Sequence, residues 1–435
     1  QSVGVELKGP EQEFRIMIEA SVERGMKVLT LSTPVKITNT TNRPLLCAFG
    51  KDSSSPLTSL QPNHSIWGSE QVQGGFVLGS QRRFIDRSRI EKELATGVVN
   101  MGNEFVMVKE TVYSVPLLSH PCRTLPCYHL ILSDILTLEN LLPESLEFQI
   151  ITPEGRVVTE NVVKPGSVQR VTTCRFSKKE GLRVSLRLVT ESFEFSSYDN
   201  SINPTLSQPN GTCLLVNRET GIQLRLHYEF THSKQGTWNL QLYCKYWIMN
   251  KTGDDLILAD AGNSSYCFFA PGYPVDVKTE NETLWNEEML LQPILFSVCE
   301  DGKKEEAKVM LQGDYLWSQP FSINTQGMRG ECIVRGRSEG EREHCFAVVI
   351  SRAPGIFARS LVVTLTPLYI LMNELPQLIR IRQEDTLENV VLQPHSSTPY
   401  HWTSLSSPRS IQLLLDSYAW SSPFPLVPGH YSLAL

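Results

Sequence analysis

LTLSTPVKITN, residues 29–39, is the first of four eleven-residue blocks in this chain of 435 residues. The others are LILSDILTLEN at 130–140, LQLYCKYWIMN at 240–250 and VTLTPLYILMN at 363–373, and all four end in asparagine. Counted from that asparagine, positions minus ten, minus eight, minus four, minus two, plus six and plus eight are apolar in every copy. A period of two on both sides of a fixed polar residue predicts a strand, a tight turn and a returning strand.

A second landmark follows each block: an apolar residue, a variable residue, a proline and a small or polar residue. The proline fixes its own φ and donates no hydrogen bond, so it predicts a turn at one place in every copy. The four landmarks are Leu60-Gln61-Pro62-Asn63, Val163-Lys164-Pro165-Gly166, Phe269-Ala270-Pro271-Gly272 and Leu392-Gln393-Pro394-His395.

Successive block asparagines lie 101, 110 and 123 residues apart, too far for a solenoid and close to the size of one small β-sandwich. We therefore predict an all-β fold, a tandem array of about four β-sandwich repeats of roughly 100–120 residues. Scattered Pro and Gly residues, 26 and 27 in number, fit many short strands separated by turns. The expected units are 1–105, 106–222, 223–348 and 349–435, the last of them truncated.

Charge and hydropathy narrow the functional classes. A net charge of −6 argues against binding nucleic acid or an anionic membrane through bulk charge. No apolar run reaches 18 residues, so no membrane span is predicted. Because the chain starts at Gln1 and ends in strand-like sequence, we expect it to be a fragment of a larger protein.

Ten cysteines and six Asn-X-Ser/Thr sequons could indicate an extracellular array of immunoglobulin-like domains. The expected units, however, hold one, four, five and no cysteines, which is not a repeated disulfide framework. We therefore predict reduced thiols and a cytoplasmic chain, with the sequons present by chance.

Catalytic and metal motifs are weak. No nucleophile elbow, phosphate loop, zinc-protease helix or dinucleotide fingerprint occurs, so no enzyme activity and no cofactor are expected. One segment, SHPCRTLPCYH, gathers four zinc-type ligands, but two prolines stiffen it and no distant pair anchors it. We interpret it as a turn rather than a metal site; its four residues are His120, Cys122, Cys127 and His129.

The repeated asparagines indicate a structural role more than a catalytic one, since a reaction rarely needs the same group in four places. A strand-ending Asn can use its side-chain amide to satisfy backbone groups in its own turn or an adjoining loop. We expect Asn39, Asn140, Asn250 and Asn373 to hold loops that support a binding surface.

Several segments, most specifically from about residue 240 onward, resemble the adaptor-binding region of the vacuolar protein sorting thirteen family of bridge-like lipid transfer proteins, part of which is also called a SHORT-ROOT-binding-type domain. The segments are Tyr246–Gly253, Ala353–Phe357, Val363–Pro367, the Asn373 block, Tyr400-His401-Trp402, Trp420-Ser421-Ser422-Pro423-Phe424 and Trp317-Ser318-Gln319-Pro320-Phe321. The family pattern has six asparagine-marked repeats, and this sequence shows four.

The resemblance implies tandem β-sandwich modules that bind short Pro-x-Pro-type peptides of organelle-resident adaptor proteins. Such binding would recruit a lipid transfer protein to membrane contact sites, and it implies a cytoplasmic protein, peripheral on organelle membranes such as Golgi or endosome. An extended Pro-containing peptide can add to a strand edge while its prolines pack on aromatic rings. A candidate peptide shelf comprises Trp317, Phe321, Tyr400, Trp402, Trp420 and Phe424, although the repeated Trp-Ser-x-Pro-Phe also fits a core plug beside a strand bend.

Two other functions remain open. The repeats could be a structural spacer within a long protein, or an extracellular adhesion array. Binding of a Pro-x-Pro peptide would distinguish a recruitment module from a structural spacer. Cysteines found as free thiols would exclude an extracellular adhesion array.

Overall fold

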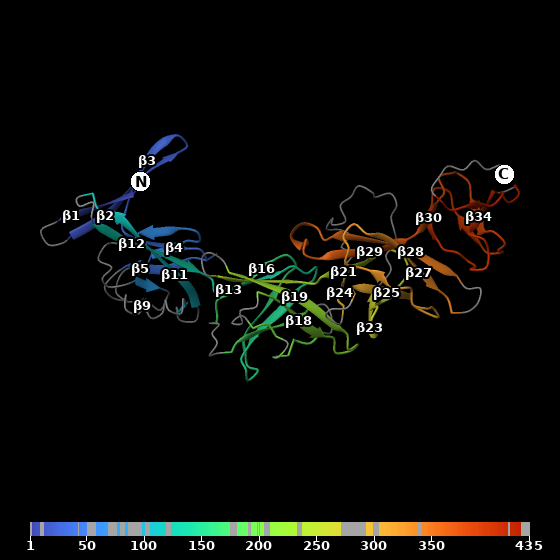
Figure 1. Ribbon diagram of the computed structural model, residues 1–435, viewed down its shortest axis with the longest axis horizontal. Helices are drawn as coiled ribbons and strands as arrows, with labels where there is room; N and C mark the ends of the chain where they lie inside the picture. The colour runs from blue at the N-terminus through green and yellow to red at the C-terminus, as the bar shows by residue number, and fades with distance from the viewer. Residues whose placement is uncertain are drawn as a thin grey trace.

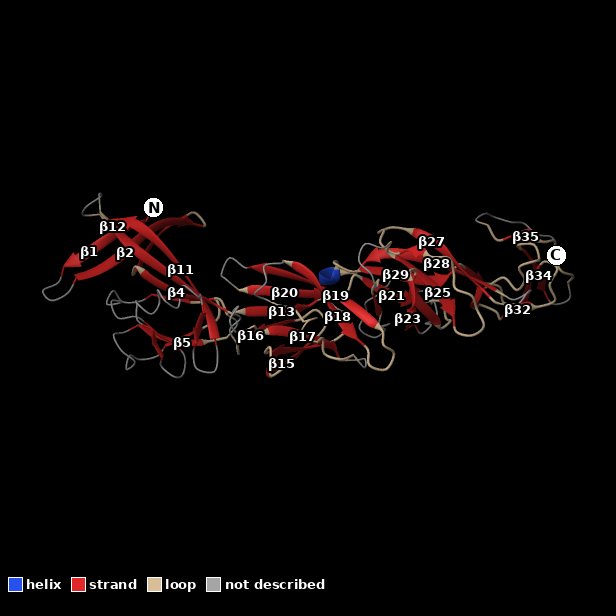
Figure 2. Ribbon diagram, turned by 60° about the horizontal axis from the view of Figure 1, so that its bottom comes forward, coloured by secondary structure: helices blue, strands red, loops and turns tan. Residues whose placement is uncertain are grey.

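A computed structural model shows a row of β-sheet units with the two termini at opposite ends (Figure 1). Among the residues that the structure describes, the regular structure is strand apart from one short 3-10 turn, η1 (Gly355–Phe357) (Figure 2). The all-β prediction is confirmed. No helix in the described part of the chain has the length and hydropathy of a membrane span. The structure describes residues 2–8, 13–41, 43–49, 58–67, 76–78, 83–85, 98–100, 105–118, 123–174, 181–189, 193–197, 199, 201–203, 209–232, 237–270, 293–298, 304–337, 342–415 and 418–427.

The chain begins with an antiparallel sheet of three strands, β1 (Ser2–Lys8), β2 (Glu13–Glu23) and β3 (Met26–Ser32). Leu29 and Leu31 on β3 are 64% and 61% exposed, whereas their counterparts Leu130 and Leu132 in the second block are buried. The difference arises because β3 has no parallel neighbour among the described strands, while the later copies of this strand have one.

Each following unit pairs a larger sheet with a second one. In the first unit the strand order is β10-β11-β12-β4-β7 in one sheet and β6-β5-β8-β9 in the other. The strands are β4 (Val35–Asn39), β5 (Leu45–Phe49), β6 (Thr58–Leu60), β7 (Ser65–Trp67), β8 (Phe76–Leu78), β9 (Arg83–Ile85), β10 (Val98–Asn100), β11 (Phe105–Pro116) and β12 (Thr124–Ser133).

The second unit repeats this plan, with order β16-β13-β20-β19-β18 in the five-stranded sheet and β15-β14-β17 in the three-stranded one. Its strands are β13 (Leu136–Asn140), β14 (Leu146–Ile151), β15 (Val157–Val163), β16 (Val168–Val171), β17 (Arg183–Leu188), β18 (Asn210–Val216), β19 (Gln223–His232) and β20 (Trp238–Tyr243).

The third unit has sheets β24-β21-β29-β28-β27 and β23-β22-β25-β26, and the fourth has β30-β33 and β32-β31-β34-β35. The third contains β21 (Tyr246–Asn250), β22 (Leu256–Asp260), β23 (Asn263–Ala270), β24 (Ile294–Phe296), β25 (Glu306–Leu311), β26 (Phe321–Ser322), β27 (Arg329–Arg335), β28 (Glu343–Arg352) and β29 (Leu361–Pro367). The fourth contains β30 (Tyr369–Met372), β31 (Ile379–Gln383), β32 (Asn389–Leu392), β33 (Ser397–Tyr400), β34 (Ser410–Leu415) and β35 (Phe424–Pro425).

In the first three units the opening and closing strands are parallel neighbours. β4 pairs with β12, β13 with β20 and β21 with β29. The register is the same each time, since position minus two of one block lies opposite position minus ten of the next. The three pairs are Ile37 with Leu130, Leu138 with Leu240 and Ile248 with Val363.

The local interpretation of each block as one strand that turns and comes back was wrong. Every block is two strands: the first closes one unit and the second opens the next, as β12 and β13 do on either side of Asp134 and Ile135. The period breaks at position minus six, where Thr33, Asp134, Cys244 and Pro367 stand. The strand after the asparagine turn also lies in the other sheet of its unit, not in a hairpin with its predecessor.

The strand pairings also indicate where one unit ends and the next begins. The predicted divisions after residues 105 and 348 fall inside β11 and β28. We propose divisions at 133–136, 243–246 and 367–369, because every sheet that follows β3 then lies within a single unit.

Apolar side chains from both sheets of a unit meet in its core. In the first unit, Ile37 and Leu132 of the larger sheet and Leu45 and Leu60 of the other belong to one buried cluster. One continuous cluster runs through the second and third units, and the fourth has a cluster that includes Cys345 from β28. Burial of this surface is the main stabilising contribution to such a fold.

Seven cysteines in the described residues are buried and form no disulfide, and native thiol labelling is expected to be slow. Burial raises the pKa of the Cys244 thiol to about 12, and burial with the nearby Glu343 carboxylate raises that of Cys345 to about 12. At pH 8 their thiolate fraction should be roughly a thousandfold below that of a free cysteine. Iodoacetamide labelling followed by peptide mapping should modify Cys244 and Cys345 only in denaturant. Rapid labelling of either residue in the native chain would contradict the packing. The seven are Cys47, Cys127, Cys174, Cys213, Cys244, Cys332 and Cys345.

Candidate functional site

The asparagine that ends each block is buried and holds a turn through its side-chain amide. Asn250 Nδ2 donates to the carbonyl oxygens of Asp254, at 2.7 Å, and Ala270, at 2.9 Å. Its Oδ1 accepts from the Thr252 backbone N–H at 3.1 Å and from the Thr252 hydroxyl at 2.7 Å. One amide therefore ties the turn after β21 to the end of β23.

The other three copies make the same bonds. In each, Nδ2 donates to the carbonyl four residues on and to a carbonyl in the first two residues of the second landmark, just before its proline, while Oδ1 accepts from the N–H two residues on. All four markers are at most 3% exposed. The donor contacts are Asn39 to Arg43 and Leu60, Asn140 to Glu144 and Val163, and Asn373 to Gln377, Leu392 and Gln393.

The second landmark forms a turn that bonds back to the marker. Asn63 N–H donates to the Asn39 carbonyl at 2.7 Å, and Gly166 N–H donates to that of Asn140 at 2.8 Å. Asn63, Gly166 and His395 have φ of 59°, 64° and 55°, directly after a proline, which is the pattern of a type II turn. Positive φ falls on these residues and not on the markers: Asn39, Asn140 and Asn250 end their strands, and Asn373 directly follows β30.

The same bonds bear on two of the glycosylation sequons. N-linked glycans attach to Nδ2, and in Asn39 and Asn250 that atom is buried and donates two hydrogen bonds. The folded turns therefore leave no room for a glycan at these two positions.

The Trp-Ser-x-Pro-Phe segments form one structural device in the third and fourth units. Ser318 N–H donates to the Val309 carbonyl at 2.8 Å, and its hydroxyl accepts from Val309 N–H at 3.0 Å. Ser421 makes the same two bonds with Leu413, at 2.8 and 3.0 Å. Each serine thus makes the two hydrogen bonds that a residue of a neighbouring strand would make, Ser318 with β25 and Ser421 with β34.

A third copy, not recognised in the sequence, lies in the second unit at Phe195-Ser196. Ser196 bonds Leu186 of β17 in the same way, at 2.9 and 3.1 Å. A cation also stacks on the aromatic ring before each serine: Arg187 on Phe195, Lys308 on Trp317 and Arg382 on Trp420. The proline and second aromatic that made the other copies visible are absent here.

The six residues of the candidate peptide shelf do not form one surface. Tyr400, Trp402 and Phe321 are buried, at 1%, 2% and 9% exposure, and the first two pack in the core of the fourth unit. The partly exposed members are Trp317 in the third unit and Trp420 and Phe424 in the fourth. Trp420 lies under the Arg382 guanidinium, which is 4.0 Å from its ring centroid.

The structure describes two of the four residues of the metal candidate. Cys127 is buried with its Sγ 3.8 Å from the Met17 sulfur, and His129 Nε2 shares a hydrogen bond of 2.8 Å with the Thr38 hydroxyl. His120 and Cys122 lie outside the described residues.

The third and fourth units meet through a buried carboxylate. Glu343, at the start of β28, exchanges backbone hydrogen bonds with Trp402 at 2.8 and 3.2 Å. Its side chain is fully buried and forms ion pairs with Arg335, at 3.1 Å, and with Arg409 of the fourth unit. Beside this bridge lie three further side chains, Asp254, His344 and His401, that no sequence spacing had connected.

Comparison with known proteins agrees with this architecture. Residues 100–427 match the family described as vacuolar-sorting associated protein 13, adaptor binding domain. Similar curated proteins include the intermembrane lipid transfer protein VPS13 of Chaetomium thermophilum, 24% identical over 306 residues. Two from Dictyostelium discoideum are vps13E, 23% identical over 345 residues, and tipC, 24% identical over 332 residues.

The matches cover 69%, 69% and 66% of this chain but only 9%, 8% and 8% of the three relatives. The chain thus spans less than a tenth of the length of these proteins. Since the family match covers most of its length, the chain belongs to the adaptor-binding domain family of vacuolar-sorting associated protein 13.

Proposed function

We propose that this chain is a non-catalytic docking module that binds short Pro-x-Pro-type peptides of organelle-resident adaptor proteins. Docking would recruit a longer lipid transfer protein to an organelle membrane, such as Golgi or endosome, and to its contact sites. The family match across residues 100–427 carries this proposal. The rival is a structural spacer, which needs the same sheets but no ligand.

Three features of the sheets support peptide binding. Every unit has strands at sheet edges, such as β32 and β35 in the fourth unit, and an extended peptide can pair with an edge through main-chain hydrogen bonds. The adjoining turns are held by the buried asparagines, so an edge next to them is already ordered. A peptide kept extended by proline loses less entropy on docking.

We place the peptide at the β35 edge of the fourth unit, beside Trp420. This ring is partly exposed, and its stacking on Arg382 fixes its orientation, which suits packing against a proline ring. Tyr400 and Trp402 contribute from below, by filling the core under the same sheet. Phe424 of β35 packs partly against that core and lines the edge.

Fluorescence anisotropy with a labelled ten-residue Pro-x-Pro peptide tests the function. We expect saturable binding at micromolar Kd, equivalent to roughly −8 kcal/mol, and at least a tenfold loss when both prolines become alanine. Lack of saturation up to ~1 mM would favour the spacer.

A matched pair of variants tests the location. Trp420→Ala should weaken binding at least tenfold, whereas Trp317→Ala, the same change at the equivalent position of the third unit, should leave it unchanged. The opposite result would move the peptide to the third unit, and equal effects would reject the Trp420 site. Circular dichroism of both variants checks that the sheets persist.

A further inference from the structure

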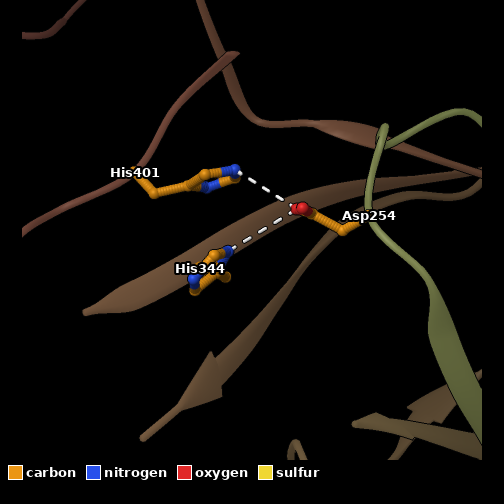
Figure 3. A group of neighbouring side chains, drawn as sticks. All are labelled: Asp254, His344 and His401. Atoms are coloured by element: carbon orange, nitrogen blue, oxygen red, sulfur yellow. Dashed lines mark ion pairs between the residues drawn. The ribbon is translucent and has the colours of Figure 1, made fainter. Parts of the chain in front are cut away.

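Two imidazoles and one carboxylate converge where the third unit meets the fourth (Figure 3). Asp254 lies in the turn after β21, His344 on β28 and His401 directly after β33. Both rings point toward the Asp254 carboxylate: His344 Nδ1 is 3.6 Å and His401 Nε2 is 3.8 Å from its Oδ2. One ligand atom from each residue lies within 4.8 Å of the other two.

These separations are too long for hydrogen bonds, which have donor–acceptor distances of about 2.7–3.2 Å. They are close to the spacing of two ligands on one metal ion, since Zn–N and Zn–O bonds of about 2.0–2.2 Å at tetrahedral angles put ligand atoms roughly 3.3 Å apart. His344 Nδ1 is also buried without a hydrogen-bond partner among the described residues, although it faces the carboxylate.

We propose that Asp254, His344 and His401 bind one divalent transition cation of the zinc type, which links the third unit to the fourth. Imidazole nitrogens with a carboxylate oxygen are a ligand set that zinc accepts, with water in the remaining position. Among the described residues, these three make up the group of His, Cys and acidic side chains with metal-ligand spacing.

The charges near the three side chains are compatible with a bound cation. The Asp254 carboxylate supplies one negative charge to the group. The nearby Arg342 is paired with Glu388 at 3.0 Å, which offsets its charge.

Neighbouring side chains outside the proposed ligand set orient two of the ligands. The Tyr315 hydroxyl lies 3.4 Å from His344 Nε2, on the ring atom opposite the one that faces Asp254. The Asp254 carbonyl accepts the hydrogen bond from Asn250, so the turn that carries the carboxylate is fixed by a marker asparagine. The Asp254 side chain is 38% exposed against 11% and 13% for the histidines, which leaves an entry path on its side.

The test uses the full 435-residue chain after chelator treatment, with zinc chloride added in a calorimeter. We expect one equivalent to bind with micromolar or lower Kd. Co²⁺ should produce the intense visible absorption of a four-coordinate site, and zinc should slow amide exchange around residues 254, 344 and 401.

Asp254→Asn and His401→Asn should each weaken zinc binding at least a hundredfold and abolish the Co²⁺ spectrum. His395→Asn is the matched control: this histidine is exposed in the same unit, and asparagine tolerates its φ of 55°. Asp254→Asn keeps the shape of the side chain, so it remains informative should His401→Asn unfold. Absence of saturable binding, or equal binding by Asp254→Asn and the unmodified chain, would overturn the proposal.

Discussion

Asn140→Asp is expected to destabilise the second unit by about 3–5 kcal/mol at neutral pH. The change preserves shape but replaces the Nδ2 donor by an acceptor that faces the carbonyl oxygens of Glu144 and Val163, originally 2.8 and 2.9 Å away. A carboxylate buried there would have no donor partner on that side. Asn140→Ala should cost less, about 2–3 kcal/mol, because it leaves unpaired carbonyls and a small cavity without adding charge.

The direction of the pH dependence distinguishes this mechanism from loss of packing. Burial and the two carbonyls should raise the pKa of the introduced carboxyl above its value in the unfolded chain. The destabilisation should therefore be largest above that raised pKa and should shrink as pH falls toward about 4. Asn140→Ala should show no such recovery.

Hydrogen exchange is the suitable measurement, since an array of units need not unfold in one step. Protection should fall around residues 140–146 and 163–167 in both variants. Asn161→Asp is the matched control, because Asn161 is exposed on β15 of the same unit, and it should change protection little. Unchanged protection in Asn140→Asp would refute the structural role given to the marker.

Arg409→Leu is expected to loosen the fourth unit from the third by about 2–3 kcal/mol. Arg409 is half exposed, but its partner Glu343 is fully buried, so its loss leaves that carboxylate paired with Arg335 and beside the Cys345 thiol at 3.5 Å. The backbone bridge between Glu343 and Trp402 should then open more often. Arg342→Leu is the control, since its pair with Glu388 is exposed on both sides and such pairs contribute little.

This junction should also respond to acid. Burial alone would raise the pKa of Glu343, but the Arg409 and Arg335 guanidinium groups outweigh it and hold that pKa below its ordinary value. Glu343 thus stabilises the native junction above its unfolded pKa, and the contribution disappears as pH falls through the lower folded value. Limited proteolysis should show that cleavage between the units increases at acid pH. In Arg409→Leu this increase should begin at a higher pH than in the unmodified chain. Equal cleavage of Arg409→Leu and Arg342→Leu would contradict the prediction.

The sequence supported the fold class well because the apolar period, the asparagines and the prolines are local features. It could not show which strands are neighbours. Ile37 pairs with Leu130, and Leu138 with Leu240, across about a hundred residues. The local period carries no information on such distant partners, and it led to the prediction of a strand, a tight turn and a returning strand. The break at position minus six was the available sign, since Asp134 and Pro367 do not fit a continuous strand.

The candidate sites were also predictable only where the contacts are local in sequence. The amide bonds of the markers follow from the chemistry of asparagine at a strand end. Burial of Tyr400 and Trp402 does not, because an aromatic residue in a strand fits a core and a surface equally well. The three side chains at the last junction come from separate parts of the chain, and only folding brings Asp254 and His344 together with His401.

The parallel pairing of opening and closing strands has a mechanical consequence. Because β13 and β20 run in the same direction, the chain enters the second unit at one end of the pair and leaves at the other. The same holds for β21 and β29 in the third unit. Tension between the ends of the array therefore acts along these strands and loads their hydrogen bonds together in shear. Units with such a pair should resist extension more than sheets whose hydrogen bonds are pulled apart one after another.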